Sequence, residues 1–392
     1  MKALVIAPQP FFSPRGTPFS VYYRTLVTAE LGAEVDLLTY GEGQDVDVPG
    51  LRIIRIPRLA FLGEVRVGPS YFKLVLDVFM VLWTIGLLLR NRYDFVHAHE
   101  EAVFFCRFLK PLFRFKLVYD MHSSLPQQLT NFQFTKSKLL IGLFKRLEDT
   151  CLRAADAVIT ICPDLADYAT SLLPDADKHI LIENSIFDPI KIFSNPQDCD
   201  ASLTEEEKPL ELPGGKLFLV YAGTLEAYQG IDLLIRAFER IRRENPKLFL
   251  VVVGGTQDQV EHYSAMAHQH GLDSDILFTG RVPKSHAQHY CKLASVLVSP
   301  RTKGTNTPLK IYEQLASGIP LVATRIHSHT QVLNDEVSIL VRPEPEELAK
   351  GILSALNGDG KRIATNALHF YEENYSRPIY VQKMRQLLEL LS

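Results

Sequence analysis

The sequence predicts an α/β protein with two domains, each built on a parallel sheet. Its 392 residues are 46% hydrophobic and 22% charged, which suffices for two folded domains with sizeable cores. Short apolar runs alternate with helical segments in two separate series, as in parallel sheets covered by helices on both faces. A polar, acidic, Pro- and Gly-rich stretch from Asn184 to Lys216 separates the series and has linker chemistry. We therefore expect two Rossmann-like domains facing a cleft.

The first series begins with a strand at Ala3–Ala7, a Pro- and Ser-rich loop and a helix from about Pro18 to Leu31, which Gly32 is placed to end. Further strands are predicted at 34–39, 51–56, 95–99, 117–120, 157–161 and 179–182, and helices at 71–90, 101–113 and 136–153. The apolar segment Leu74–Leu89 has 16 residues and contains Asp77. It is shorter than the ~20 residues needed to cross a bilayer, so we predict a buried helix.

The second series has strands at 217–224, 248–255, 276–280, 294–300 and 321–323 and helices at 230–244 and 257–270. An amphipathic helical stretch, 371–391, ends the chain. We assign residues 1–190 to the N-terminal domain, 191–215 to the linker and 216–373 to the C-terminal domain.

The charge is unevenly distributed. The net charge is −3, so no overall attraction to nucleic acid is implied. Between Arg52 and Arg146, however, 15 Lys and Arg stand against six Asp and Glu. This local excess indicates that one face meets an anionic surface.

The five cysteines are scattered without a Cys-x-x-Cys pair, which fits free thiols in a reducing compartment and argues against a zinc site. The opening MKALVIAPQP is a short β-like run without the apolar region of a signal peptide. We therefore expect a cytoplasmic protein.

The most informative stretch is Ser299–Arg325, which predicts a strand end, a Gly/Thr-rich loop, a helix, a Gly-Pro break and a buried strand. Backbone N–H groups at the helix start, beside Lys310, can bind an anion. The carboxylate of Glu313, just inside the helix, can accept hydrogen bonds from sugar hydroxyls. Together they suit a nucleotide diphosphate-sugar, although an ordinary βα unit with a flexible loop would have a similar pattern.

This stretch resembles the donor-binding segment of the retaining glycosyltransferases of family 4, which have the GT-B fold. Glu313 stands at the second Glu of their Glu-x7-Glu motif, and Ala316, Gly318 and Pro320 follow as in the family. Thr305 replaces the first Glu, which contacts the transferred sugar, and TPLKIYE is a variant of bacterial members. The resemblance covers nearly the whole chain. It implies an acceptor-binding N-terminal domain, a donor-binding C-terminal domain and a helix, 374–392, that crosses back to the first domain.

The resemblance also implies roles for particular residues. The residues that it assigns to donor binding are Gly16, Gly223, Thr224, Arg281, Thr305, Asn306, Thr307, Pro308, Leu309 and Glu313. Glu313 would hold the ribose, Gly16 would approach the diphosphate, and Arg281 would lie beside the nucleobase. From the residues alone, the loop with Gly16 could be a capped turn, and Arg281 could form a surface salt bridge. Arg15 could face either the donor phosphate or the acceptor.

Two cations of the family are missing. Relatives carry an Arg and a Lys on the diphosphate where this chain has Thr224 and Gln229. Arg301 and Lys310 are the predicted replacements, because a buried diphosphate without a cation would be costly. An inactive or atypical member is the alternative.

His122 follows the strand that carries Asp120, and the family places a similar His near the donor sugar and acceptor. It can donate hydrogen bonds and titrates near neutral pH, or it could cap the next helix. His97 and His99 are predicted to line the cleft or pack in the core rather than to bind a metal.

We identify no Asp-x-Asp motif of the kind that holds a divalent metal on a nucleotide-sugar, so neither a metal nor another cofactor is predicted. The family is thought to act by front-face attack, with the leaving phosphate deprotonating the acceptor. The catalytic residues would then be His122, Arg301 and Lys310.

Aromatic and basic residues alternate in 101–116 and 136–146, with Arg107, Lys110 and Arg114 among the cations. This pattern suits an anionic bilayer surface, although a helix that packs its apolar face on the sheet would look alike. We thus predict a retaining glycosyltransferase, peripheral on the inner face of the cell membrane, with a glycan or lipid-linked acceptor and no nucleic acid partner. The rivals are a catalytically weak sugar-nucleotide-binding scaffold and an epimerase of the same fold.

Overall fold

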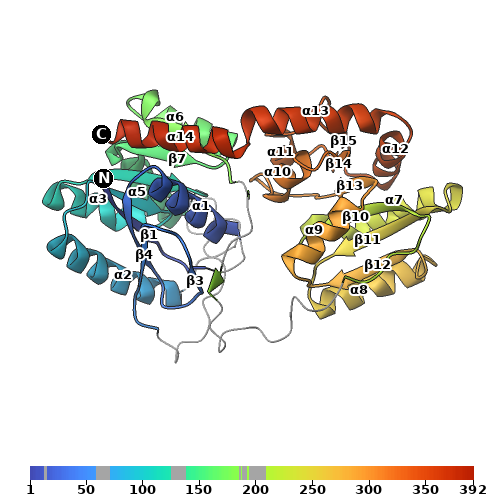
Figure 1. The fold of residues 1–392 in the computed structure, drawn as a ribbon, viewed down its shortest axis with the longest axis horizontal. Helices are drawn as coiled ribbons and strands as arrows, with labels where there is room; N and C mark the ends of the chain where they lie inside the picture. The colour runs from blue at the N-terminus through green and yellow to red at the C-terminus, as the bar shows by residue number, and fades with distance from the viewer. Residues whose placement is uncertain (13–15, 59–70, 125–137, 185–186, 188–191, 194–208) are drawn as a thin grey trace. The chain divides into compact units, whose positions relative to one another are not determined.

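The computed structural model describes residues 1–12, 16–58, 71–124, 138–184, 187, 192–193 and 209–392 (Figure 1). The chain forms two compact units. The first consists of Met1–Cys199 and Arg377–Ser392, and the second of Asp200–Ser376.

The first unit is built on a seven-stranded parallel sheet. Its strand order is β4 (Leu51–Arg55), β2 (Glu34–Thr39), β1 (Lys2–Ala7), β5 (Phe95–His99), β6 (Lys116–Met121), β7 (Ala157–Thr160) and β8 (His179–Leu181). The central strands are buried on both faces, which explains their nearly continuous apolar sequences. A short antiparallel ladder pairs β3 (Asp45–Val46) with β9 (Ile192–Phe193).

Helices cover both faces of this sheet. On one face α1 (Gly16–Glu30) and α14 (Arg377–Leu390) contact each other over a shared core (Figure 1). The other core is covered by α2 (Tyr71–Arg90), α3 (Ala102–Phe113), α5 (Lys138–Ala154) and α6 (Pro163–Leu172). A 3₁₀ turn, η2 (Ala176–Lys178), precedes β8.

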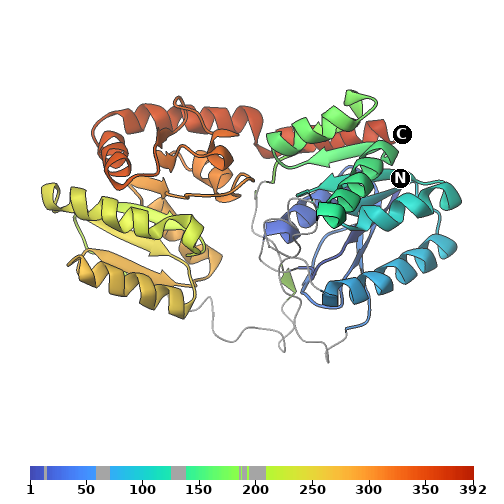
Figure 2. The same ribbon diagram turned by 180° about the vertical axis from the view of Figure 1, so that it is seen from behind.

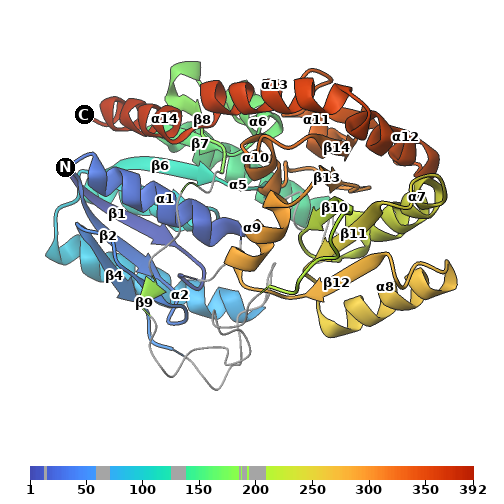
Figure 3. The same ribbon diagram turned by 45° about the vertical axis from the view of Figure 1, so that its right-hand side comes forward.

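The second unit has a six-stranded parallel sheet. Its strand order is β12 (Ile276–Gly280), β11 (Leu248–Val253), β10 (Leu217–Ala222), β13 (Val296–Ser299), β14 (Leu321–Thr324) and β15 (Ile339–Val341). Three helices cover one face, where α7 and α12 lie side by side (Figure 3): α7 (Ile231–Glu244), α8 (Gln257–Gln269) and α12 (Pro345–Leu356). The other face packs against α9 (Lys284–Lys292), α10 (Lys310–Leu315) and α13 (Asp359–Asn374). Two short turns complete the unit, η3 (Ala227–Gln229) and α11 (His327–Thr330).

Two sequence predictions need correction. The helix at 71–90 is not buried all round, because Leu74, Val78 and Leu82 are exposed. The final helical stretch is two helices, α13 and α14, since Pro378 lacks the N–H that would continue a single helix through the break before Arg377. In addition, β15 and the helices α6, α9 and α12 were not predicted from the sequence.

The fully buried guanidinium of Arg24 joins four segments of the first unit. Its Nε donates to Asp120 Oδ2 at 3.0 Å and its Nη2 to the carbonyl oxygen of Ile182 at 2.7 Å. Nη1 donates to the Tyr380 hydroxyl, and the guanidinium carbon lies 5.1 Å from the Tyr380 ring centroid. Burial alone would raise the pKa of Asp120, but Arg24, together with the surrounding histidines His122, His99 and His97, holds that pKa well below its usual range.

Replacing Arg24 with Met should destabilise the first unit by about 3–5 kcal/mol, because Asp120 would remain as a buried charge without its main partner. Arg377→Met, at the start of α14, is the matched control. It removes a half-exposed pair with Glu30, and such pairs are worth about 0–1 kcal/mol. Urea unfolding, with hydrogen exchange in β6 and α14, measures both. Equal stability of the two variants would contradict the role assigned to Arg24.

Candidate functional site

Two loops meet at the carboxyl end of the second sheet. One follows β10 at residues 223–230, and the other follows β13 at residues 300–309. The backbone N–H of Thr302 donates to the carbonyl oxygen of Tyr228 at 2.8 Å. A Cβ at Gly230 would lie 2.1 Å from the Pro300 oxygen, and this residue has a φ of +74°, so only glycine permits the approach. Ligands of open parallel sheets bind at this end of the strands.

Lys310 presents a buried cation at this junction. Its Nζ lies 4.0 Å from the centroid of the Tyr221 ring. This nitrogen atom is inaccessible to solvent and has no hydrogen-bond partner among the described residues. Burial, followed by repulsion from Arg301, lowers the pKa of Lys310 to about 7. A buried cation without an anion is unfavourable, so this position is suited to an anionic ligand.

Arg301 adds a second positive charge. Its guanidinium carbon lies 5.2 Å from the centroid of Tyr228, and its Nε donates to the Lys303 carbonyl at 2.7 Å. The side chain passes so close to Gly304 that a Cβ there would lie 2.3 Å from Nη2. Its guanidinium donates to the carbonyl oxygens of Lys303 and Asn306, and no carboxylate pairs with it in the described part of the chain. The two predicted replacement cations therefore occur together without neutralising side chains.

A buried histidine supports the start of this loop. His329 Nδ1 lies 2.8 Å from the Thr324 carbonyl oxygen, and its Nε2 lies 3.1 Å from Ser299 Oγ. The Thr324 hydroxyl in turn donates to the Arg301 carbonyl oxygen. Burial, with repulsion from Lys310 and Arg301, lowers the pKa of His329 to about 4, so the ring is neutral. The support that this residue gives the loop was not predicted from the sequence.

Several other predicted donor residues lie in the same two loops, beside these cations. The Thr224 carbonyl accepts from Tyr221 at 2.6 Å, and Gln229 donates to the Thr224 hydroxyl at 3.3 Å. A Cβ at Gly223 would lie 3.5 Å from Lys310 Nζ. The Thr307 hydroxyl is buried and has no hydrogen-bond partner among the residues that the structure describes.

Residues 305–309 lead into α10, which is anchored by Ile311 and Leu315. The Thr305 hydroxyl lies 3.4 Å from the Asn306 side-chain oxygen, and the carbonyl oxygens of Pro308 and Leu309 accept from the first N–H groups of the helix. With only six residues, α10 contributes little dipole, so Lys310 and Arg301 are the stronger attraction for an anion.

Glu313 lies one turn into α10. Its carboxylate is half-exposed and lies 3.4 Å from the ammonium of Lys284, at the start of α9. Arg281 is exposed at the end of β12, three residues before Lys284. The carboxylate is thus accessible to a ligand and held by a cation.

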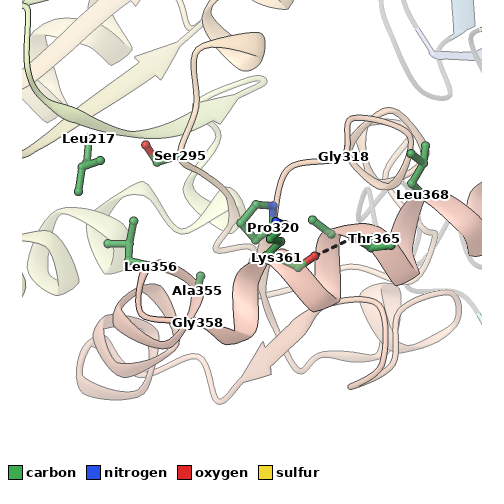
Figure 4. Close-up of a pocket in the computed structure, with 11 residues that line it drawn as sticks. Leu217, Ser295, Gly318, Pro320, Ala355, Leu356, Gly358, Lys361, Thr365 and Leu368 are labelled. Carbon is green, nitrogen blue, oxygen red and sulfur yellow. Dashed lines mark hydrogen bonds between the residues drawn. The ribbon is translucent and has the colours of Figure 1, made fainter.

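A concavity of about 610 Å³ lies at the opposite end of this sheet (Figure 4). Leu217, Ser295 and Pro320, which stand at the amino ends of three strands, line it with residues of α12 and α13. Its side chains are mostly apolar, and Lys361 is its one charged residue. It is separate from the loops described above.

In the first unit, three histidines surround Asp120. His97 Nε2 lies 3.0 Å from Asp120 Oδ2, His99 Nδ1 lies 3.0 Å from His122 Nε2, and His122 Nε2 lies 3.3 Å from Asp120 Oδ1. Burial lowers the pKa of His122 to about 4 against the attraction of Asp120. The prediction that His122 titrates near neutral pH is therefore corrected: the ring is neutral and acts through hydrogen bonds.

His97, His99 and Asp120 form a group that could hold a metal, since their ligand atoms lie within 4.8 Å of one another. The Arg24 guanidinium, however, already lies 3.0 Å from the Asp120 oxygen that such an ion would share. A divalent ion would add charge beside a buried cation. The cluster fits a charge-balanced hydrogen-bond network better than a metal centre.

The remaining predicted residues have different surroundings. Gly16 begins α1, and Arg15 lies outside the described residues, as does Lys136 in the basic segment 136–146. Lys110 pairs with Asp156 at 2.7 Å and donates to the Ala154 carbonyl, so it is less free to meet a membrane than predicted. Arg107 lies over Phe108, and Arg114 is exposed after α3.

The two parallel-sheet, Rossmann-like units define the class of α/β proteins to which this chain belongs. Two family profiles match this chain: "Glycosyl transferases group 1" over residues 203–369 and "Glycosyl transferase 4-like domain" over residues 25–185. The chain belongs to the group 1 glycosyltransferases of family 4 and has the GT-B fold. It is a hexosyltransferase-type enzyme of a retaining family that takes sugar from a nucleotide-sugar donor.

Curated relatives cover most of the chain. The D-inositol 3-phosphate glycosyltransferase of Xylanimonas cellulosilytica is 26% identical over 86% of this chain and 82% of its own length. The phosphatidyl-myo-inositol mannosyltransferase of Mycobacterium tuberculosis is 22% identical over 92% of this chain and 88% of its own. Among solved structures, the Anabaena protein HepE in complex with UDP superposes with a TM-score of 0.69 and 16% identity, covering 100% of this chain and 99% of its own.

Lys310→Met should stabilise the free protein while weakening nucleoside diphosphate binding. The folded pKa of about 7 lies below the ordinary 10.5, so the cost of the buried charge is present below pH 7 and fades as the pH rises toward 10.5. Each pKa unit corresponds to about 1.4 kcal/mol, so we expect a gain of at least that size at neutral pH and none in strong base.

Calorimetry with a nucleoside diphosphate provides the second measurement. Wild-type affinity should fall as the pH rises through 7, since only the protonated amine attracts the phosphate. Lys310→Met should bind the nucleoside diphosphate at least about tenfold more weakly, and its affinity should not fall as the pH rises through 7. Any pH dependence that remains in this variant reports titration of the ligand. Identical pH profiles in the two proteins would exclude Lys310 from the anion site.

Proposed function

We propose that this enzyme transfers a hexose, with retention and without a metal, from a nucleotide diphosphate-sugar to a glycan or lipid-linked acceptor. The observation that carries the proposal is the pair of unneutralised cations, Lys310 and Arg301, at the carboxyl end of the second sheet. They supply the charge that the family places at Thr224 and Gln229. The HepE complex with UDP supports a nucleotide donor, and the name of the mycobacterial relative supports a lipid acceptor.

In the proposed reaction the acceptor hydroxyl attacks the anomeric carbon from the face that the diphosphate leaves. The carbon–oxygen bond to the diphosphate breaks as the new glycosidic bond forms. The acceptor proton passes to an oxygen of the departing phosphate. Lys310 and Arg301 stabilise the negative charge that develops on that phosphate, and charge stabilisation of this kind acts mainly on turnover.

Sugar and ribose contacts come from the loop and α10. Glu313 is proposed to accept hydrogen bonds from the ribose hydroxyls, with Lys284 orienting the carboxylate at 3.4 Å. Thr305, in place of the family's first Glu, would offer a hydroxyl to the sugar. Its neighbour Thr307 has a buried hydroxyl that a ligand could satisfy.

His122 and Gly16 are the proposed first-unit contributors. His122 is neutral, so it would donate a hydrogen bond to the sugar or acceptor rather than carry a charge. Gly16 begins α1, where free N–H groups can meet a phosphate.

A thermal-shift panel of UDP-, GDP- and ADP-sugars, followed by an assay for free sugar, tests the function. A bound donor raises the unfolding temperature by mass action. Slow hydrolysis of the stabilising donor would support a transferase. A donor that binds tightly without any turnover, with or without acceptor, would favour a catalytically weak scaffold instead.

Glu313→Ala should weaken nucleotide binding about 10- to 150-fold, because a charged hydrogen bond contributes ~1.5–3 kcal/mol. Lys284→Ala is the matched control. It frees the carboxylate without removing it and should cost clearly less. Titration calorimetry with the nucleotide from the panel measures both. Unchanged affinity in Glu313→Ala would remove the ribose role from this residue.

A further inference from the structure

The outward side of α2 carries an unusual row of exposed aliphatic side chains. Leu74, Val78 and Leu82 recur every four residues and are 59%, 59% and 57% exposed, and Leu89 is 73% exposed. Side chains at this spacing lie on one side of a helix. The opposite side of α2, with Leu76, Met80 and Leu88, fills the core. The exposed row is therefore not needed to fill the core of the first unit.

Neighbouring helices extend the row. α2, α3 and α5 cover the same face of the first sheet and lie side by side (Figure 2). Of 14 exposed large apolar side chains in the described chain, eight are on these three helices. We call them the apolar face: Leu74, Val75, Val78, Leu82, Leu89, Phe108, Leu112 and Leu143. Such clustering marks an interaction surface rather than scattered surface leucines.

The exposed charges described on the three helices themselves have one sign. The exposed charged side chains described on these helices are all basic: Arg90, Lys145, Arg146 and Arg153. The described carboxylates point inward instead. Asp77 accepts from Tyr40 at 2.8 Å, Asp149 from Tyr168 at 2.7 Å, and Glu148 from Ser124 at 2.9 Å. The surface is thus aliphatic and cationic, without exposed acid in the described part of the three helices.

We propose that the apolar face docks onto an anionic lipid bilayer, with its aliphatic side chains entering the headgroup region and the cations meeting lipid phosphates. This goes beyond the transfer reaction. An amphipathic helix lying in the interface has this combination of residues. Protein interfaces are instead enriched in Tyr and Trp and depleted of Lys, which does not match this face. No described helix is both long and apolar enough to cross a membrane, so the contact is one of surface insertion.

The contact differs from purely electrostatic docking in its response to salt. Each cation near an anionic surface contributes about fivefold to binding and is screened by salt. Insertion of aliphatic side chains is not screened in that way. Binding should therefore weaken at high salt without disappearing.

The test is flotation of the full chain with vesicles of phosphatidylcholine mixed with phosphatidylglycerol, and with phosphatidylcholine alone, at low and high salt. The test variant combines Leu74→Gln, Val78→Gln and Leu82→Gln, which are exposed and leave the core intact. The matched control combines Leu293→Gln and Leu368→Gln, exposed leucines of the second unit outside the apolar face. Unfolding temperatures and donor hydrolysis verify that both variants remain folded.

Wild-type protein and the control should float with the mixed vesicles, and the triple variant should bind at least about 100-fold more weakly at both salt concentrations. Replacing Lys145 and Arg146 with Gln should reduce binding mainly at low salt. Wild-type protein that stays unbound, or a triple variant that binds equally well, would overturn the proposal. So would a wild-type dimer that the triple variant abolishes in light scattering, since the face would then bind a second copy.

Discussion

The buried guanidinium of Arg24 is the group on which most of the first unit depends, because segments far apart in sequence reach it. It donates hydrogen bonds to oxygen atoms of β6, of the residue after β8 and of α14. The same charge keeps Asp120 ionised, and Asp120 in turn contacts His97 and His122. The final helix is thus connected to the histidine cluster through Tyr380, Arg24 and Asp120.

The second unit follows the opposite principle. Its two central cations, Lys310 and Arg301, are held without anionic partners by aromatic rings, backbone carbonyls and tight glycine turns. The free protein bears the cost of that arrangement, and a diphosphate would relieve it. Binding energy is then directed to the group that leaves during the reaction, where added negative charge develops. The neutral ring of His329 keeps a third charge away from the same place.

Under the proposed function, Lys310 and Arg301 meet from different positions the charge requirement that relatives meet at the places of Thr224 and Gln229. The residues at the usual places, Thr224 and Gln229, bond to each other in this chain. Lys310 reaches toward the same loop from α10, beside Gly223, and Arg301 reaches back over Tyr228. The proposed site needs positive charge near the loop after β10, and different segments of the chain can supply the side chain that carries it.

The sequence by itself determined the alternation of strands and helices, the two parallel sheets, and the motif residues Lys310, Glu313 and Arg301, because these features are local in periodicity and spacing. Tertiary structure alone decided which groups are neutral, paired or exposed. Burial lowers the pKa of His122 out of the neutral range, and Lys110 forms an ion pair with Asp156. The apolar segment around Leu74 reads as core in sequence, yet only one side of α2 meets the sheet. Burial and pairing depend on residues distant in the chain, and a local pattern carries no information about them.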